Sequence, residues 1–219
     1  MKIATWNVER LKHFRQLDKI RLACLTVRAD ILVLTETDER IALPYKHCFF
    51  SAPLTDDDPV YYKNTERRIA IYTDYDCVGT HVTYDEKTAL CVELETEKGH
   101  LSVYGTIIGI HGNRCCTFME DMKKQMDDLR RITSAGNALC FCGDYNCSFA
   151  DNYYFTYQGR DTLLSSFAEN GLDVLTAAQS QCIDHITISS CFCSSAEPAV
   201  EEWNVDKSLS DHKGISVSV

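Results

Sequence analysis

The chain has 219 residues, of which 45% are hydrophobic and 25% charged, as in ordinary soluble globular proteins. Its 22 basic and 32 acidic residues give a net charge of −10, which disfavours tight non-specific binding to long nucleic acid but is compatible with a local basic groove. No apolar run is long enough for a membrane span. Because no linker or repeat interrupts the sequence, we expect a single domain over residues 1–219.

The first nine residues already have the pattern of a structural element, so we expect no secretory signal and a cytoplasmic, intracellular location. In that compartment the twelve cysteines are expected to stay reduced. Cys115-Cys116 and Cys191-x-Cys193 lack the paired Cys-x2-Cys spacing of a zinc site, and structural zinc is therefore not expected.

Hydrophobic periodicity predicts the elements of the first half. Residues 2–8 alternate as a strand, apolar residues recur at helical spacing over 12–27, and a buried strand over 31–34 ends in Thr35-Glu36-Thr37-Asp38. The acidic run 55–59 is interpreted as a solvated turn. Further strands are expected over residues 69–73, 77–83, 89–96 and 100–108, with a hairpin turn at 97–100.

In the second half, a methionine-rich stripe predicts a core-facing helix over 115–134, and a second helix over 159–169 is closed by Gly171. A buried strand over 138–142 lies between them, and the last strands are expected over 183–189, 191–196 and 214–219. This order predicts an α/β (α+β) fold. We expect a four-layer α/β/β/α sandwich of two mixed β-sheets with outer helices.

Polar residues lie at or just beyond the ends of five predicted strands. They are Asn7, Glu9, Glu36, Asp144, Asn146, Asp184, Asp211 and His212. Each has an ordinary explanation when taken alone: Gly143 to Asn146, for example, could form a simple turn. Carboxylates gathered in one place would repel one another unless a cation neutralised them, and oxygen ligands favour the hard ions Mg2+ or Mn2+.

Five short motifs, in this order, resemble those of the endonuclease/exonuclease/phosphatase superfamily, which includes exonuclease III, DNase I and inositol polyphosphate 5-phosphatases. The motifs are Thr5-Trp6-Asn7-Val8-Glu9, Leu34-Thr35-Glu36, Gly143-Asp144-Tyr145-Asn146, Ile183-Asp184-His185-Ile186 and Ser210-Asp211-His212. The resemblance extends over nearly the whole chain. It implies a Mg2+ or Mn2+ ion held mainly by Glu36, with Asn7, Glu9 and Asp211 as direct or water-mediated ligands.

The resemblance also implies catalytic roles. Asp144 would activate a water molecule for in-line attack on phosphorus, and Asn146 would hold a phosphate oxygen or that water. His212 would stabilise the charge that develops on the phosphorus centre. Asp184 would pair with His212 and favour its cationic form.

The sequence points less clearly to residues that would contact the substrate than to the catalytic and metal-binding residues. Thr106 falls where the family often places Tyr or His, at the end of the central strand, but it has neither ring. Four arginines near loop or strand edges are candidates for further phosphates or for surface salt bridges: Arg67, Arg68, Arg114 and Arg160. Tyr153 belongs to an aromatic cluster that would stack on single-stranded nucleic acid or cover the edge of the core.

The sequence therefore predicts a metal-dependent phosphodiester hydrolase, with a nuclease acting on DNA or RNA as the first interpretation. The alternative is a phosphatase or phosphodiesterase for a small-molecule or lipid-derived phosphate, because one catalytic core serves both. A degenerate binding protein is disfavoured by the complete set of acids. Nucleic acid is the expected partner, and neither a membrane nor an obligate protein partner is inferred.

Overall fold

Alternating and continuous apolar runs form two six-stranded sheets in the computed structural model, which describes residues 1–54, 61–193 and 198–219. The first sheet has the order β11-β12-β1-β2-β4-β3. Its strands are β1 (Lys2–Asn7), β2 (Ile31–Asp38), β3 (His47–Phe50), β4 (Glu66–Thr73), β11 (Ala199–Trp203) and β12 (Gly214–Ser218). The central strands β1 and β2 are parallel and place Asn7 beside Thr35. Both are buried on two faces, which explains the continuous apolar run at the start of β2.

The second sheet has the order β5-β6-β7-β8-β10-β9. Its strands are β5 (Asp76–His81), β6 (Ala89–Thr96), β7 (Gly99–Ile107), β8 (Leu139–Asp144), β9 (Leu172–Val174) and β10 (Asp184–Ser189). As in the first sheet, a central parallel pair, β7 and β8, is flanked by antiparallel strands. The second sheet is built from the consecutive strands β5 to β10, whereas the first combines the first four strands of the chain with the last two, so the end of the chain returns to the sheet in which it began.

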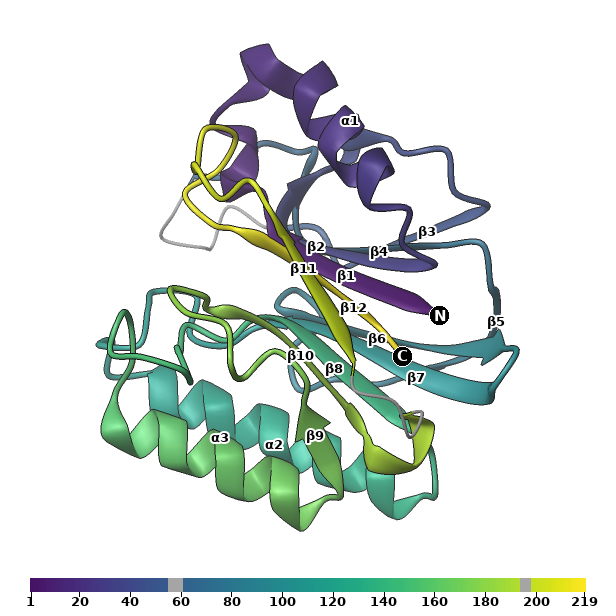
Figure 1. The fold of residues 1–219 in the computed structure, drawn as a ribbon, viewed down its shortest axis with the longest axis vertical. Helices are drawn as coiled ribbons and strands as arrows, with labels where there is room; N and C mark the ends of the chain where they lie inside the picture. Colours follow the sequence, from purple (N-terminus) through teal and green to yellow (C-terminus); the bar gives the residue numbers. More distant parts are fainter. Residues whose placement is uncertain (55–60, 194–197) are drawn as a thin grey trace.

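Helices cover the outer faces of both sheets (Figure 1). α1 (Leu17–Val27) packs on the first sheet, and α2 (Phe118–Ser134) and α3 (Tyr157–Glu169) pack on the second. Val33 and Val103 belong to the buried layer between the sheets. The predicted four-layer α/β/β/α sandwich is confirmed. Within the described ranges, no helix has both the length and the apolar character needed to cross a membrane.

The helix boundaries differ from the expected ones at their starts. α1 begins at Leu17 rather than at residue 12, because Glu9–Leu11 and Phe14–Gln16 form short 3-10 turns. α2 begins at Phe118 rather than 115, and α3 begins at Tyr157 rather than 159. Element ends are the part of a fold that local periodicity predicts least well.

Three short strands, β3, β9 and β11, are not predicted by the sequence pattern. β3, β9 and β11 lie at sheet edges, where fewer apolar residues are needed. The expected strand over 191–196 is wrong at its start, because Ser190–Phe192 forms a 3-10 turn. Residues 194–197 lie outside the described residues, as does the acidic run 55–59 that was interpreted as a turn.

Candidate active site

The two sheets meet at the edge where β1, β2 and β8 end and β10 begins, and Asn7 joins them. Asn7 Nδ2 lies 3.4 Å from Glu36 Oε1 in the same sheet and 3.2 Å from Asp144 Oδ2 in the other. Asn7 Oδ1 accepts a hydrogen bond from the backbone N–H of Glu9 at 2.8 Å. These partners fix the amide orientation and hold two carboxylates together across the sandwich.

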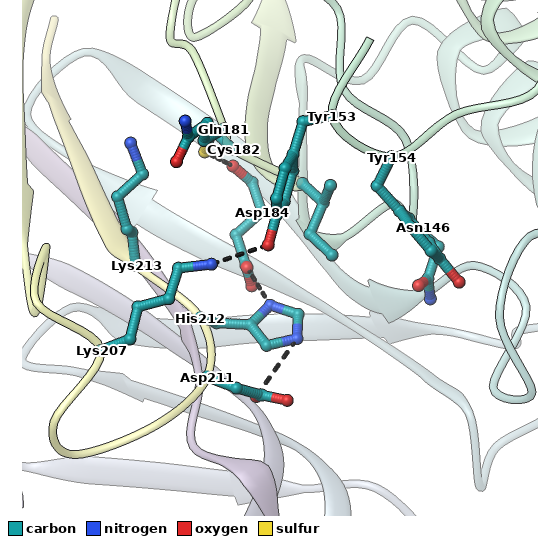
Figure 2. A pocket seen from close by; sticks show the side chains of 11 residues that line it. Asn146, Tyr153, Tyr154, Gln181, Cys182, Asp184, Lys207, Asp211, His212 and Lys213 are labelled. Atoms are coloured by element: carbon teal, nitrogen blue, oxygen red, sulfur yellow. Dashed lines mark hydrogen bonds and ion pairs between the residues drawn. The ribbon is translucent and has the colours of Figure 1, made fainter.

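Asp144 and Asp184 stand directly opposite each other on the antiparallel strands β8 and β10. Like charges in this position are destabilising, so the pair requires a positive neighbour. His212, from the loop before β12, supplies it: its Nδ1 lies 2.5 Å from Asp184 Oδ2 (Figure 2). Asp144 and Asp184 are buried, and His212 is nearly so.

Burial and charge shift the protonation of these groups. Burial raises the pKa of Asp144 to about 7, with Asp184 and Glu36 adding to the effect and His212 opposing it. Burial alone would lower the pKa of His212, but the carboxylates of Asp184 and Asp144 outweigh it and raise the pKa to about 10. His212 is therefore a cation at neutral pH. Burial also raises the pKa of Glu36.

Three residues that the sequence interpretation missed position the histidine loop. The backbone oxygen of His212 accepts hydrogen bonds from Trp6 Nε1 at 3.1 Å and Asn204 Nδ2 at 2.7 Å. Ser210 Oγ donates to the backbone oxygen of Asn7 at 2.6 Å. Trp6 and Ser210 belong to the first and the last of the five sequence motifs, so their role could have been inferred from the sequence, whereas no sequence pattern marks Asn204.

Two predicted metal ligands have other partners. Glu9 Oε1 forms a 2.6 Å ion pair with Lys12 Nζ, and Glu9 Oε2 lies 3.3 Å from the backbone nitrogen of Asp211. The Asp211 side chain is exposed, and its Oδ1 lies 3.7 Å from His212 Nε2. The direct contacts of the site thus join Asn7, Glu36 and Asp144, while Glu9 turns toward Lys12.

The backbone around Asp144 is unusual. Gly143 has φ 137°, and a Cβ there would lie 2.0 Å from the Thr106 carbonyl oxygen, so only glycine fits. Asn146 has φ 49° and Glu36 has φ 44°, both in the left-handed region that costs a non-glycine residue about 1–3 kcal/mol. Strain of this kind often gathers at functional sites.

Asn146 holds the loop that follows β8. Its backbone N–H donates to Asp144 Oδ1 at 2.8 Å, and its Nδ2 donates to the carbonyl oxygens of Ile108 at 3.1 Å and Gly109 at 3.2 Å. Both hydrogens of the Asn146 side-chain amide are thus used in hydrogen bonds to the backbone. Binding of a phosphate oxygen by the Asn146 amide, as the resemblance implies, stays a prediction. It would require the amide to give up one of its two hydrogen bonds to the backbone carbonyl oxygens.

Two pockets adjoin these residues. The larger, which we call the histidine pocket, has a volume of about 410 Å³ (Figure 2). It is lined by Asn146, Tyr153, Tyr154, Gln181, Cys182, Ile183, Asp184, Lys207, Asp211, His212 and Lys213. The smaller, the arginine pocket, has a volume of about 130 Å³. It is lined by Arg10, Glu36, Tyr62, Glu66, Arg67, Arg68, Ile107, Ile110 and His111.

Three of the six candidate substrate contacts line a pocket. Tyr153 lines the histidine pocket, and Arg67 and Arg68 line the arginine pocket. Arg67 is already paired with Glu39 at 2.5 Å, and Arg68 donates to Thr88 Oγ1 at 2.6 Å. The predicted phosphate contacts therefore compete with partners inside the protein.

The other three lie elsewhere. Arg160 stacks 3.7 Å from the centre of the Phe155 ring and donates to the Asp151 carbonyl oxygen, so it supports a loop. Arg114 is exposed in the turn before α2. Thr106 is fully buried, with Oγ1 2.5 Å from Gln125 Oε1.

The register explains why Thr106 does not reach the site. In the parallel pairing of β7 with β8, Ile107 stands beside Asp144 and Thr106 stands beside Gly143. The strand-end position beside the Asp144 carboxylate is therefore apolar, and Ile107 contributes to the arginine pocket. A shift of one residue along a strand moves a side chain to the opposite face.

The donor set fits a magnesium-type ion that keeps much of its water. Glu36 and Asp144 are carboxylates joined by one amide, and the raised pKa of each reflects burial that a divalent cation would offset. Among the described residues, no three His, Cys, Asp or Glu side chains form a ready metal-binding group. Mg2+ is commonly held by only one or two carboxylates plus water, which such an arrangement can supply.

No protein-family model matches the chain, and no curated protein matches it in sequence. Solved structures match it in fold. A 3′ phosphatase from Neisseria, solved with a product DNA hairpin, is 16% identical, with a TM-score of 0.71 over 100% of this chain and 98% of that one. An AP endonuclease from Archaeoglobus fulgidus is 14% identical, with a TM-score of 0.69 over 100% and 98%.

An endonuclease/exonuclease/phosphatase protein from Beutenbergia cavernae is 17% identical, with a TM-score of 0.67 over 99% of this chain and 70% of that one. These proteins share the arrangement of two packed mixed sheets that the motifs predicted. The chain therefore has the fold of the endonuclease/exonuclease/phosphatase proteins.

Proposed function

We propose that the protein is a metal-dependent phosphodiester hydrolase that cleaves nucleic acid. The observation that carries this proposal is the junction of the two sheets, where Asn7 joins Glu36 to Asp144 while His212 is paired with Asp184. A buried carboxylate beside a fixed imidazolium is suited to removing a proton from water next to a negatively charged phosphate. The DNA-bound phosphatase and the AP endonuclease that share the fold support a nucleic-acid substrate.

Asp144 would be the general base. Its two oxygens are oriented by the backbone N–H of Asn146 and by Asn7 Nδ2, so the carboxylate cannot rotate freely. Burial raises its pKa to about 7, which brings its proton affinity closer to what a general base needs at neutral pH. General-base catalysis of this kind contributes about 10²–10⁴-fold to a rate.

His212 would stabilise the charge that develops on the phosphate. The Asp184 carboxylate accepts a hydrogen bond from Nδ1–H, which leaves Nε2–H on the other side of the ring to donate to a phosphate oxygen. Because the carboxylates of Asp184 and Asp144 raise the pKa of His212 to about 10, the ring stays positively charged at neutral pH. Fixed donors aimed at developing charge are often the largest contribution to catalysis.

Glu36 and Asn7 are the residues that would hold Mg2+ or Mn2+, with Glu9 and Asp211 contributing through water. When bound, the ion would offset the negative charge of a phosphate oxygen and of the leaving oxygen. Burial of Glu36, which raises its pKa, supports this role because a nearby cation favours the ionised carboxylate.

A panel of DNA, RNA and small phosphoesters, assayed with Mg2+ and after chelation, tests the proposal. We expect metal-dependent cleavage of nucleic acid, and Asp144→Asn should lower the rate by about 10²–10⁴-fold with the fold retained. Asp173→Asn, at an exposed position on β9, is the matched control and should keep wild-type activity. Absence of any phosphoester hydrolysis would contradict the proposal.

The second candidate is a phosphatase or phosphodiesterase for a small phosphate ester. The size of the histidine pocket favours it, since about 410 Å³ lies within the range of small-ligand sites. Turnover of small phosphoesters, with DNA and RNA left intact, would select this function over the nuclease.

A further inference from the structure

The histidine pocket has a wall made by two loops that are distant in sequence. Tyr153 lies on the loop between β8 and α3, and Lys207 lies on the loop between β11 and β12 that also carries His212. Lys207 Nζ donates to the Tyr153 hydroxyl at 2.8 Å, and both side chains line the pocket beside Asp184 (Figure 2). We call this contact the Tyr153–Lys207 bridge.

Both ends of the bridge are supported by their own loops. Asp151 Oδ1 accepts from the Tyr153 backbone N–H at 3.0 Å, and Asp151 Oδ2 accepts from the Gln181 N–H at 2.7 Å. On the other loop, the Lys207 N–H donates to the Asn204 carbonyl oxygen at 2.9 Å, and Asn204 also holds His212. The bridge is therefore tied to the loop that positions the catalytic histidine.

The lining of the pocket suits one nucleotide. Tyr153 and Tyr154 present aromatic surface on which a base can stack, and Gln181 and Lys207 offer polar groups. Asp184 Oδ1 is buried and has no hydrogen-bond partner among the described residues, although buried polar atoms are normally paired. A sugar hydroxyl of a bound nucleotide is one donor that would satisfy it.

We propose that the Tyr153–Lys207 bridge makes the histidine pocket a closed-sided site for one chain-terminal nucleotide, so that the enzyme acts at strand ends. This inference rests on the proposed phosphodiester hydrolysis. A strand cut internally must continue on both sides of the scissile phosphate. With that phosphate beside Asp144 and His212, the bridge would close one of the two sides, because it joins the loops that carry Tyr153 and Lys207. Tyr153 and Lys207 are thus residues that set specificity.

The reaction at a strand end is an ordinary hydrolysis. The oxygen of water forms a new bond to phosphorus, and the bond from phosphorus to the oxygen of the remaining strand breaks. That strand oxygen takes up a proton, and the nucleotide in the pocket leaves with the phosphate. Asp144 receives the proton from water, as in the proposed function, and no oxidant or further reactant is needed.

The activity test compares a linear single-stranded oligonucleotide with a covalently closed circle of the same sequence, both with Mg2+. We expect wild-type protein to cleave the linear strand at least about tenfold faster, a ratio equivalent to 1.4 kcal/mol. Lys207→Met and Tyr153→Phe should each reduce that ratio, and the double variant should match the single ones because all three remove the same hydrogen bond. Lys123→Met, on the exposed face of α2, is the control.

A binding test is independent of turnover. Nucleoside 5′- and 3′-monophosphates are titrated by calorimetry into Asp144→Asn protein, and adding Lys207→Met should weaken the binding of at least one of them about tenfold. If wild-type protein cuts the circle as fast as the linear strand, the proposed function stands and this inference is overturned. If no nucleic acid is cut, the proposed function fails, and a lack of monophosphate binding would overturn the pocket assignment separately.

Discussion

The histidine pocket and the arginine pocket both adjoin the candidate site, but the cations that line them have different partners. In the arginine pocket each guanidinium has an acidic partner: Arg10 pairs with Glu66 at 2.8 Å, Arg67 with Glu39 at 2.5 Å and Arg68 with Asp85 at 3.9 Å. In the histidine pocket His212 also faces carboxylates, through Nδ1 and, at 3.7 Å, through Nε2, whereas Lys207 Nζ donates to the neutral Tyr153 hydroxyl at 2.8 Å. Arginines near a site thus do not by themselves make a phosphate-binding surface, because partners within the protein can already occupy them.

The largest expected difference between the pockets is in catalysis. His212→Gln should lower kcat by about 10²–10⁴-fold, because it removes the fixed cation beside the phosphate. His111→Gln, at an exposed position in the arginine pocket, should change kcat less than tenfold. Steady-state kinetics on the best substrate of the panel measures both variants. Equal losses in the two would show that the pockets share the chemistry.

A second histidine, His185, follows Asp184 on β10, and its pKa is shifted in the opposite direction to that of His212. It is fully buried, with Nε2 3.0 Å from the Cys147 carbonyl oxygen and Nδ1 2.9 Å from Thr176 Oγ1. Burial lowers the pKa of His185 to about 4, against about 6.5 in an unfolded chain. Between these values the unfolded state binds more protons, so the free energy of unfolding falls as the pH drops from about 6.5 to about 4, by about 3 kcal/mol in total.

Urea unfolding of wild-type protein and His185→Gln at several pH values between 7 and 4 checks this prediction. The free energy of unfolding of His185→Gln should fall less between pH 7 and pH 4 than that of wild type, whatever its value at pH 7. His100→Gln, which changes an exposed histidine, should keep the wild-type pH dependence. If His185→Gln loses as much stability in acid as wild type, His185 is not held as a neutral imidazole in the folded protein.

The smallest of the three effects concerns the arginine pocket. Arg10 donates from Nε and Nη2 to Glu66 Oε2, and Glu66 is 2% exposed. Arg10→Met should cost about 2 kcal/mol of unfolding free energy, because a buried carboxylate loses its main partner. Adding Glu66→Gln should recover part of that loss in a double-mutant cycle.

The same variants also report on function. If the arginine pocket is structural, Arg10→Met with Glu66→Gln should keep kcat/KM within about tenfold of wild type, where tenfold corresponds to 1.4 kcal/mol. If the double variant regains its stability but loses much of its activity, the arginine pocket would instead be a binding site for substrate phosphates. The contrast between the two pockets would then fail.

Much of the architecture follows from local pattern. Apolar runs over 31–34 and 138–142 predict the buried strands β2 and β8, and the methionine stripe predicts the inward face of α2. Tyr145 is buried on the side of the strand opposite to Asp144, as alternation predicts. Alternation failed at Glu9, because Glu9, Arg10 and Leu11 all have positive φ and turn the chain out of the strand.

The strand-end positions of five residues can be inferred from the order of residues alone, since each lies at or near the start or the end of a predicted strand: Asn7, Glu36, Asp144, Asp184 and His212. Which of them touch is a separate matter. The contacts from Asn7 to Asp144 and from His212 to Asp184 cross between the two sheets, as does the bridge from Tyr153 to Lys207. Periodicity carries no information on how distant segments pair, so these contacts are decided only when the sheets pack together. The same packing sets the one-residue register that buries Thr106 and brings acidic partners to the arginines of the arginine pocket.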